Sequence, residues 1–68
     1  MNATRYSVVI QWSEEDQAYI ARAPELPGCI THGDTYEEAL KNALEVIDLW
    51  IEAAQKSGRP IPPPRLAA

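Results

Sequence analysis

Three consecutive acids, Glu14, Glu15 and Asp16, are the residues with the most obvious capacity for chemistry. Clustered carboxylates can hold Mg²⁺ and direct water at a phosphodiester, so a small metal-dependent nuclease is one hypothesis, with Asp16 as its test residue. The spacing argues against it, because three successive residues of a turn point in divergent directions and no fourth acid joins them from a strand. We therefore expect no metal here and interpret the three acids as a solvated hairpin tip.

Cys29 and His32 are the only cysteine and the only histidine of the chain, and they lie close together in the sequence. They are three residues apart on a short strand-like segment, which places their side chains on opposite faces and prevents a catalytic dyad. Cys29 is expected to be buried as a small apolar residue. As the only cysteine, it allows no intramolecular disulfide. The three glycines, Gly28, Gly33 and Gly58, are isolated, so none forms a phosphate-binding loop. From these observations together we predict no catalytic residue and no cofactor.

The charge is unevenly distributed along the chain. The formal net charge is −4, but all ten acids lie between Glu14 and Glu52, where Arg22 and Lys41 are the only bases, so this stretch carries −8. An acidic body repels phosphate backbones and attracts a basic protein. The simpler alternative is that the acids only solvate the surface.

With 68 residues, the chain is expected to form one domain, residues 1–68, with frayed ends at Met1–Thr4 and about Pro63–Ala68. A domain of this size buries only ~60% of its unfolded surface, so association with itself or with a partner is a natural source of further stability. No signal peptide is visible and no apolar run approaches the ~18 residues of a membrane span, which predicts a cytoplasmic protein.

Alternating apolar residues predict three short strands. The first covers Arg5–Ser13, the second Ala18–Ala23 and the third Cys29–His32, with a hairpin turn at residues 14–17. Between the second and third strands, Pro24 ends pairing and Pro27-Gly28 forms a corner.

A capping box predicts a helix starting at Thr35. The Thr35 hydroxyl can accept from the Glu38 amide while the Glu38 carboxylate accepts from the Thr35 amide. Gly58 is well placed to end the helix, and Leu49 falls outside its apolar stripe. The stripe comprises Ala39, Leu40, Ala43, Leu44, Val46, Ile47, Trp50, Ile51 and Ala54.

The segment Arg59–Arg65 is too rich in proline for a central strand. It is either an extended edge segment with Ile61 tucked in or a polyproline II tail, and we expect order through Ile61 or Pro62.

Taken together, these features resemble the HicB antitoxin family, over about Tyr6–Pro64. The resemblance implies an α+β fold with the order β-β-β-α-β, in which a curved antiparallel sheet of three to four strands is covered on one face by one long helix, as in a partial ribonuclease-H-like domain. The residues that carry it are Pro24, Leu26, Pro27, Gly28, Cys29, Gly33, Asp34, Thr35, Glu38 and Ala39.

The resemblance also implies a function. HicB-like antitoxins bind and block HicA toxins, which are small basic proteins that cleave mRNA with a histidine, and they are not themselves enzymes. Longer members carry a C-terminal DNA-binding domain for which this chain has no room, so direct nucleic-acid binding is not expected. The alternative is a stand-alone HicB-like domain without a toxin, forming a homodimer or higher homo-oligomer in an unknown regulatory role.

Two sets of candidate contact residues follow from these hypotheses. The candidates for binding a basic partner are Glu14, Glu15, Asp16, Glu25 and His32, and those for self-association are Leu49, Trp50 and Ile61.

Overall fold

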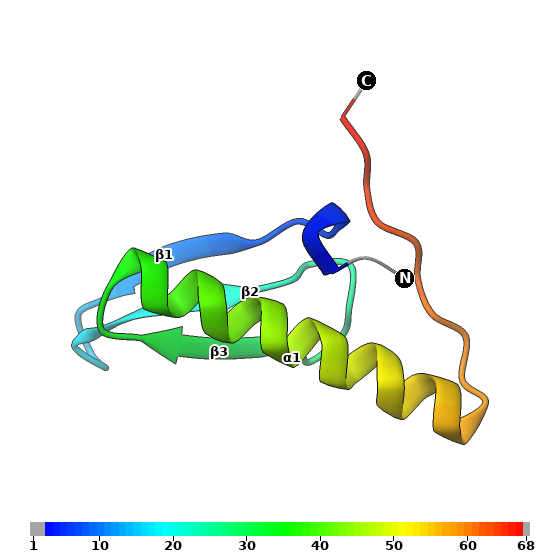
Figure 1. Ribbon diagram of the computed structural model, residues 1–68. Coiled ribbons are helices and arrows are strands. Elements are labelled where there is room, and N and C mark those ends of the chain that lie inside the picture. Colours follow the sequence, from blue (N-terminus) through cyan, green and yellow to red (C-terminus); the bar gives the residue numbers. More distant parts are fainter. Residues whose placement is uncertain (1–2, 68) are drawn as a thin grey trace.

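The computed structural model describes residues 3–67 as one antiparallel sheet with a single long helix across one of its faces (Figure 1). The elements in chain order are a 3₁₀ turn, η1 (Ala3–Arg5), the strands β1 (Val9–Ser13), β2 (Ala18–Arg22) and β3 (Ile30–Gly33), and the helix α1 (Tyr36–Ser57). The sheet order is β1-β2-β3 with both pairs antiparallel. The expected α+β architecture is confirmed, with three strands. Residues 59–67 run extended without joining the sheet, so the final strand of the expected β-β-β-α-β order is not formed in the described part of the chain.

β1 begins at Val9, four residues later than the alternation predicted. Val9 lies opposite Arg22, so any earlier residue of β1 would face Ala23 or Pro24. Proline has no amide to donate to a ladder, and the pairing therefore stops. The preceding residues Ala3–Arg5 form a 3₁₀ turn instead of continuing the strand.

Both ends of α1 are capped by the residues expected to cap them. Thr35 is extended (φ −131°, ψ 165°), and the Glu38 amide donates to its hydroxyl at 3.0 Å. The predicted hydrogen bond from the Thr35 amide to the Glu38 carboxylate is wrong. That carboxylate accepts instead from the amide of Asp34, at 3.1 Å. At the other end Gly58 takes a left-handed conformation (φ 70°), and the Arg59 amide donates to the Ala54 carbonyl at 2.9 Å.

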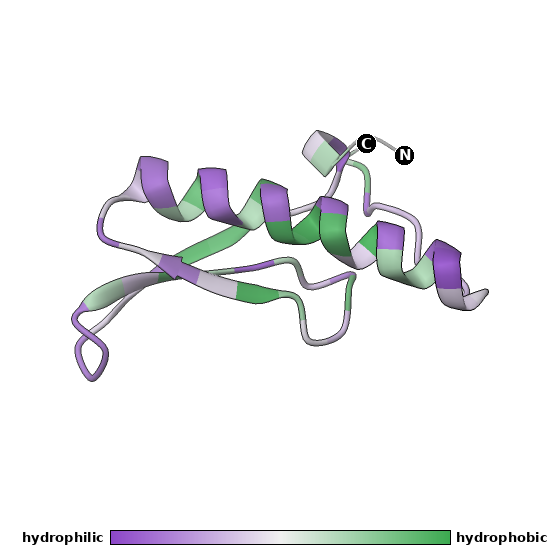
Figure 2. Ribbon diagram, turned by 60° about the horizontal axis from the view of Figure 1, so that its bottom comes forward, coloured by the Kyte–Doolittle hydropathy of each residue, from purple (hydrophilic) through white to green (hydrophobic). Residues whose placement is uncertain are grey.

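The core has two parts along the helix. Near the N-terminus of α1, the small residues Ala39 and Ala43 lie against Ala21 of β2. Gly33 makes this approach possible, since a Cβ there would lie 2.4 Å from the Ala39 backbone nitrogen. The second half of α1 lies beyond the sheet and packs on larger side chains, and the buried members of this part are Ala3, Tyr6, Ala23, Leu26, Cys29, Ile47 and Ile51. Figure 2 shows the apolar side of α1 turned toward the sheet and the polar side turned away.

The sheet face opposite the helix is open. Alternation places Ala21 under α1, so its neighbours Ile20 and Arg22 point to the other side, beside His32 and Ile30 of β3. His32 and Arg22 are exposed, and Ile30 is 57% exposed. The two layers measure 16 Å across their thinnest dimension.

Candidate partner-binding surfaces

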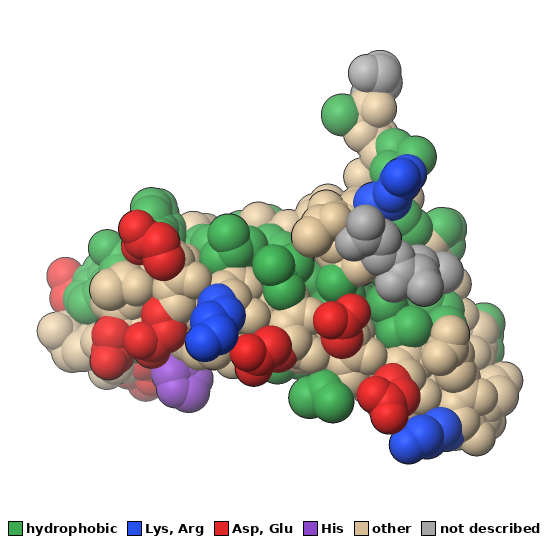
Figure 3. Space-filling model, viewed as in Figure 1, with side chains coloured by type: hydrophobic (Ala, Val, Ile, Leu, Met, Phe, Trp, Pro, Cys, Tyr) green, Lys and Arg blue, Asp and Glu red, His purple; other side chains and the backbone are tan. Residues whose placement is uncertain are grey.

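Acidic side chains dominate the outside of the molecule. Nine of the ten acids are exposed, and the exception is Glu25. Figure 3 shows them along the outward side of α1 and at the end of the molecule where α1 begins. The outward side of α1 contains one ion pair among the described residues, between Lys56 Nζ and Glu52 Oε1 at 3.2 Å.

The acidic hairpin tip is held in shape by its own side chains. The Ser13 hydroxyl donates to the Asp16 carboxylate at 3.1 Å and accepts from the Asp16 amide at 3.2 Å. Gln17, whose φ is 51°, donates from Nε2 to the Glu14 carbonyl at 2.6 Å and to the Glu14 carboxylate at 3.1 Å. The charges of this turn are therefore presented on a defined frame.

Two of the predicted partner contacts lie at one hollow on the open face. Asp16, Ala18, Ile20 and His32 line a depression of about 350 Å³. The backbone of His32 is fixed from the helix side, because Asn42 Nδ2 donates to its carbonyl at 2.8 Å. Glu14 and Glu15 occupy the adjoining turn. Within residues 3–67 no three His, Cys, Asp or Glu side chains come close enough to hold a metal ion.

Glu25 does not share this surface, because its side chain is only 7% exposed. Its Oε2 accepts three hydrogen bonds of 3.0 Å, from the Ser7 amide, the Ser7 hydroxyl and the Arg65 amide. Its Oε1 is buried without a hydrogen-bond partner among the described residues. Glu25 thus joins the start of the chain, the loop after β2 and the C-terminal segment, and we call this set of contacts the Glu25 clamp.

The clamp keeps its carboxylate ionised. Burial by itself raises the pKa of Glu25. Hydrogen bonds from the Arg65 and Ser7 amides, from its own backbone and from the Ser7 hydroxyl outweigh burial and lower the pKa to about 2. Beside it, Tyr6 donates to the Pro62 carbonyl at 2.6 Å. Burial and the charge of Glu25 together raise the pKa of the Tyr6 hydroxyl. Contacts of the C-terminal segment therefore reach Arg65, beyond the Ile61 or Pro62 of our expectation; Met1, Asn2 and Ala68 lie outside the described residues.

Of the three self-association candidates, only Leu49 stands free of the core, with 63% of its surface exposed. Trp50 is half-buried, donating from Nε1 to the Pro27 carbonyl at 2.9 Å, and the Arg59 guanidinium lies 5.4 Å from its ring centre. Ile61 packs against the core under the second half of α1.

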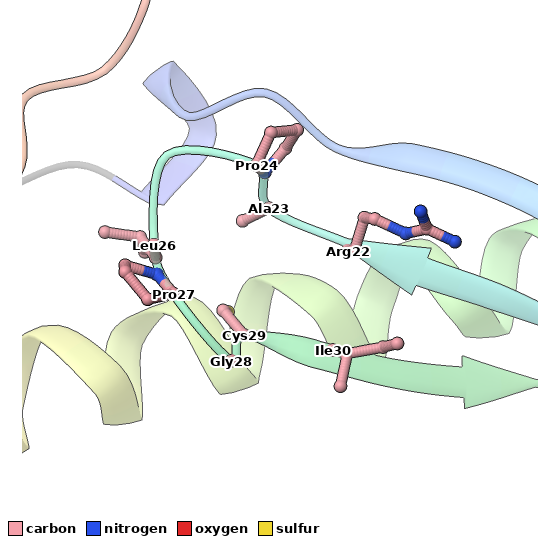
Figure 4. A pocket seen from close by; sticks show the side chains of 8 residues that line it. All are labelled: Arg22, Ala23, Pro24, Leu26, Pro27, Gly28, Cys29 and Ile30. Atoms are coloured by element: carbon pink, nitrogen blue, oxygen red, sulfur yellow. The ribbon is translucent and has the colours of Figure 1, made fainter.

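The loop between β2 and β3 surrounds a second open hollow, of about 460 Å³, shown in Figure 4. Leu26 turns inward, 2% exposed, whereas Pro24 and Pro27 form its exposed corners. Gly28 makes the turn with φ 75°. Cys29 is buried as expected, and burial raises the pKa of its thiol, which keeps it in the unreactive protonated form. This hollow carries structural residues and no reactive group.

The sequence reasoning missed the contacts that join distant segments. The Glu25 clamp links residues 18 and 40 positions apart. A glutamate between two prolines was the only available sign of it. It also missed the side of β1 that α1 leaves uncovered, where Trp12 is 47% and Leu40 43% exposed. Within the described residues, no helix is long and apolar enough to cross a membrane.

Comparison with known proteins gives concordant matches. Residues 6–67 match the family model described as the HicB_like antitoxin of bacterial toxin-antitoxin systems. A "UPF0150 protein" of Thermoplasma acidophilum is 43% identical over 58 residues, covering 85% of this chain and 83% of that protein. Another, from a Synechocystis species, is 42% identical over 57 residues, covering 84% and 71%. A solved chain from a "HicA3 and HicB3 toxin-antitoxin complex" superposes with a TM-score of 0.74 at 31% identity, over 88% of this chain and 69% of the other.

Proposed function

Because the chain belongs to the HicB-like antitoxin family, we propose that it is a non-enzymatic antitoxin that binds and neutralises a small basic mRNA-cleaving toxin of the HicA type. The observation that carries the proposal is the likeness, in sequence and in fold, to a chain solved within a toxin–antitoxin complex. We place this activity in the cytoplasm, where such a toxin meets its mRNA.

The charge of the molecule supports this role. A toxin that binds RNA presents a basic face to phosphates, and a protein with nine exposed acids offers that face an alternative partner. Complementary charge accelerates encounter and selects the partner, while the affinity depends on the contacts made after docking.

We propose that the toxin contacts the hairpin end of the molecule. There Glu14, Glu15 and Asp16 lie in one ordered turn, and Asp16 shares its hollow with His32. Ile20 in the same hollow supplies an apolar centre bordered by charge. Glu25 contributes indirectly, by holding the loop and the C-terminal segment, because its buried carboxylate is closed to a protein partner.

The proposal predicts that a small basic protein is encoded beside this chain, and the decisive experiment pairs the two purified proteins. Copurification of the two chains and loss of RNA cleavage on adding the antitoxin are the expected results. Replacing both Glu14 and Glu15 by glutamine is expected to weaken binding ~10-fold, mainly through the association rate and more strongly at low salt. The matched control replaces Glu45 and Glu52 by glutamine, which also neutralises two exposed acids but on α1, away from the hairpin. Equal binding by the Glu14/Glu15 variant and the wild type would remove the hairpin from the interface, and uninhibited cleavage would refute the function.

A second candidate, self-association without a toxin, is favoured by the exposure of Leu49 and by the uncovered apolar side of β1. In this case the chain forms a homodimer or higher oligomer whether or not a toxin is present. Sedimentation of the purified chain distinguishes the two functions, since only the second requires an oligomer in the absence of toxin.

A further inference from the structure

The helix leaves one strand of the sheet partly bare. α1 packs mainly on β3 and β2 and touches β1 least. Val8, just before β1, and Ile10 of β1 therefore border an open hollow of about 440 Å³, which α1 closes on its other side with Tyr36, Glu37 and Leu40. Tyr36 is 57% exposed and Leu40 43% exposed. Val8 and Ile10 form the strand side of this groove, which we call the β1 groove.

The two edges of the sheet differ in their protection. At the β3 edge, Asn42 of the helix donates to the His32 carbonyl and so occupies a backbone acceptor. At the β1 edge, Val9–Ser13 contains no charged residue and no proline. Free edges of natural sheets usually carry charges, prolines or bulges, which prevent pairing with another chain. An uncharged edge beside an apolar groove is suited to receiving a further strand.

The distribution of charge identifies that strand. The end of the molecule with the hairpin carries Glu14, Glu15, Asp16 and Glu37, whereas Arg5 lies just before β1 at the opposite end. Two copies that pair antiparallel along β1 bring Arg5 of each beside the acidic hairpin of the other. A parallel pairing would instead place like charges together. The edge thus complements itself in one orientation only.

We propose that a second copy of this chain pairs antiparallel with β1 across a two-fold axis near Gln11, joining two three-stranded sheets into one. The β1 grooves of the two copies then meet on the helix side of the joined sheet, so that the side chains of Ile10, Tyr36 and Leu40 cover one another. The pairing runs in the plane of the sheet and leaves the open face, with Asp16 and His32, accessible. This inference specifies the geometry of the self-association proposed above and does not depend on a toxin.

Two matched lysine variants test the assignment. Gln11 and His32 are both exposed, both lie on the open face, and both neighbour Ile20 in the register, but they belong to opposite edges. Across the two-fold axis Gln11 faces its own copy, so Gln11→Lys places two like charges together. We expect sedimentation equilibrium to give twice the 7.6 kDa chain mass for the wild type and for His32→Lys. For Gln11→Lys we expect at least a ~10-fold rise in the dimer dissociation constant.

A charge reversal tests the orientation. Arg5→Glu is expected to weaken the dimer, and adding Glu15→Arg to it is expected to restore association. Circular dichroism verifies that each variant is folded. Gln11→Lys also removes the hydrogen bond that Gln11 accepts from Arg22 at 3.1 Å. If this variant unfolds, hydrogen exchange of the wild-type amides takes its place as the test, and alternate β1 amides are expected to become protected as the protein concentration rises.

The outcomes separate the assignment from the function it refines. A wild-type chain that remains monomeric up to about 100 μM overturns self-association altogether. If the wild type dimerises and Gln11→Lys leaves the dimer intact, self-association is retained and the β1 assignment is overturned. The same holds if Leu49→Ser or His32→Lys abolishes the dimer instead. Toxin inhibition by the Gln11→Lys monomer addresses the antitoxin function separately.

Discussion

Replacing Glu25 by glutamine is expected to destabilise the domain in a way that depends on pH. The substitution keeps the size of the side chain but removes the charge that accepts from Ser7 and Arg65. If the NH₂ group of the glutamine faces these donors, N–H groups oppose one another. If its carbonyl oxygen faces them, it accepts more weakly than a carboxylate.

The magnitude follows from the pKa of the carboxyl group. Glu25 titrates at about 2 in the folded chain, against an ordinary value of 4.5. This difference corresponds to about 3 kcal/mol of stabilisation at pH 7, at 1.36 kcal/mol per unit. Since the folded pKa is the lower one, the stabilisation is complete above the unfolded pKa and is lost as pH falls from about 5 toward 2. At pH 3, only about 1 kcal/mol should remain.

Urea unfolding of the wild type and Glu25→Gln at pH 7 and pH 3, at one protein concentration, measures this loss. The free energy of unfolding of the wild type relative to the variant is expected to fall by about 2 kcal/mol between the two pH values. Other acids titrate equally in both chains and cancel in the difference. A difference between wild type and variant that does not change with pH would refute the clamp as a charged contact, whatever its size at pH 7.

Three further substitutions test the fold. Gly33→Ala is expected to cost more than about 2 kcal/mol in urea unfolding, because its Cβ would meet the Ala39 backbone at 2.4 Å; a smaller loss would mean that sheet and helix separate easily. Thr35→Ala removes the acceptor of the Glu38 amide and is expected to cost about 1 kcal/mol and to lower helicity, with Thr35→Ser as the control that keeps the cap. Leu49→Ala is expected to change the free energy of unfolding by less than about 0.5 kcal/mol, since the side chain is 63% exposed; a larger loss that grows with protein concentration would place Leu49 in an interface.

The helix was predictable because its determinants are local. Thr35 and Gly58 lie at its two ends, and the apolar stripe between them predicted its buried face. The start of β1 was not predictable in this way. Its alternation continues back to Arg5, but pairing needs a partner strand, and Pro24 ends that partner. Alternation reports which side of a strand is apolar, whereas strand length depends on a segment elsewhere in the chain.

The candidate contacts divide in the same way. Glu14 and Asp16 were predicted at an exposed turn, and local bonds within that turn hold them there. Glu25 was grouped with them because it is acidic and lies in a loop. Its burial depends on Ser7 and Arg65, which approach it only in the folded chain. Charge alone cannot distinguish an acid that serves a partner from one that serves the fold.

The helix is much longer than the sheet it covers, so the packing of the core is unevenly distributed along the molecule. α1 has 22 residues, about 33 Å, whereas β3 has four, about 13 Å. The large apolar residues Leu26, Ile47 and Ile51 are gathered under the half of α1 that lies beyond the strands, while alanines occupy the half above them. Most of the packing energy is therefore located far from the acidic hairpin. Such a molecule can exchange the residues of its hairpin at little cost in stability. Under the proposed role of the hairpin in binding, the specificity of the domain can then change with its partner while the fold is retained.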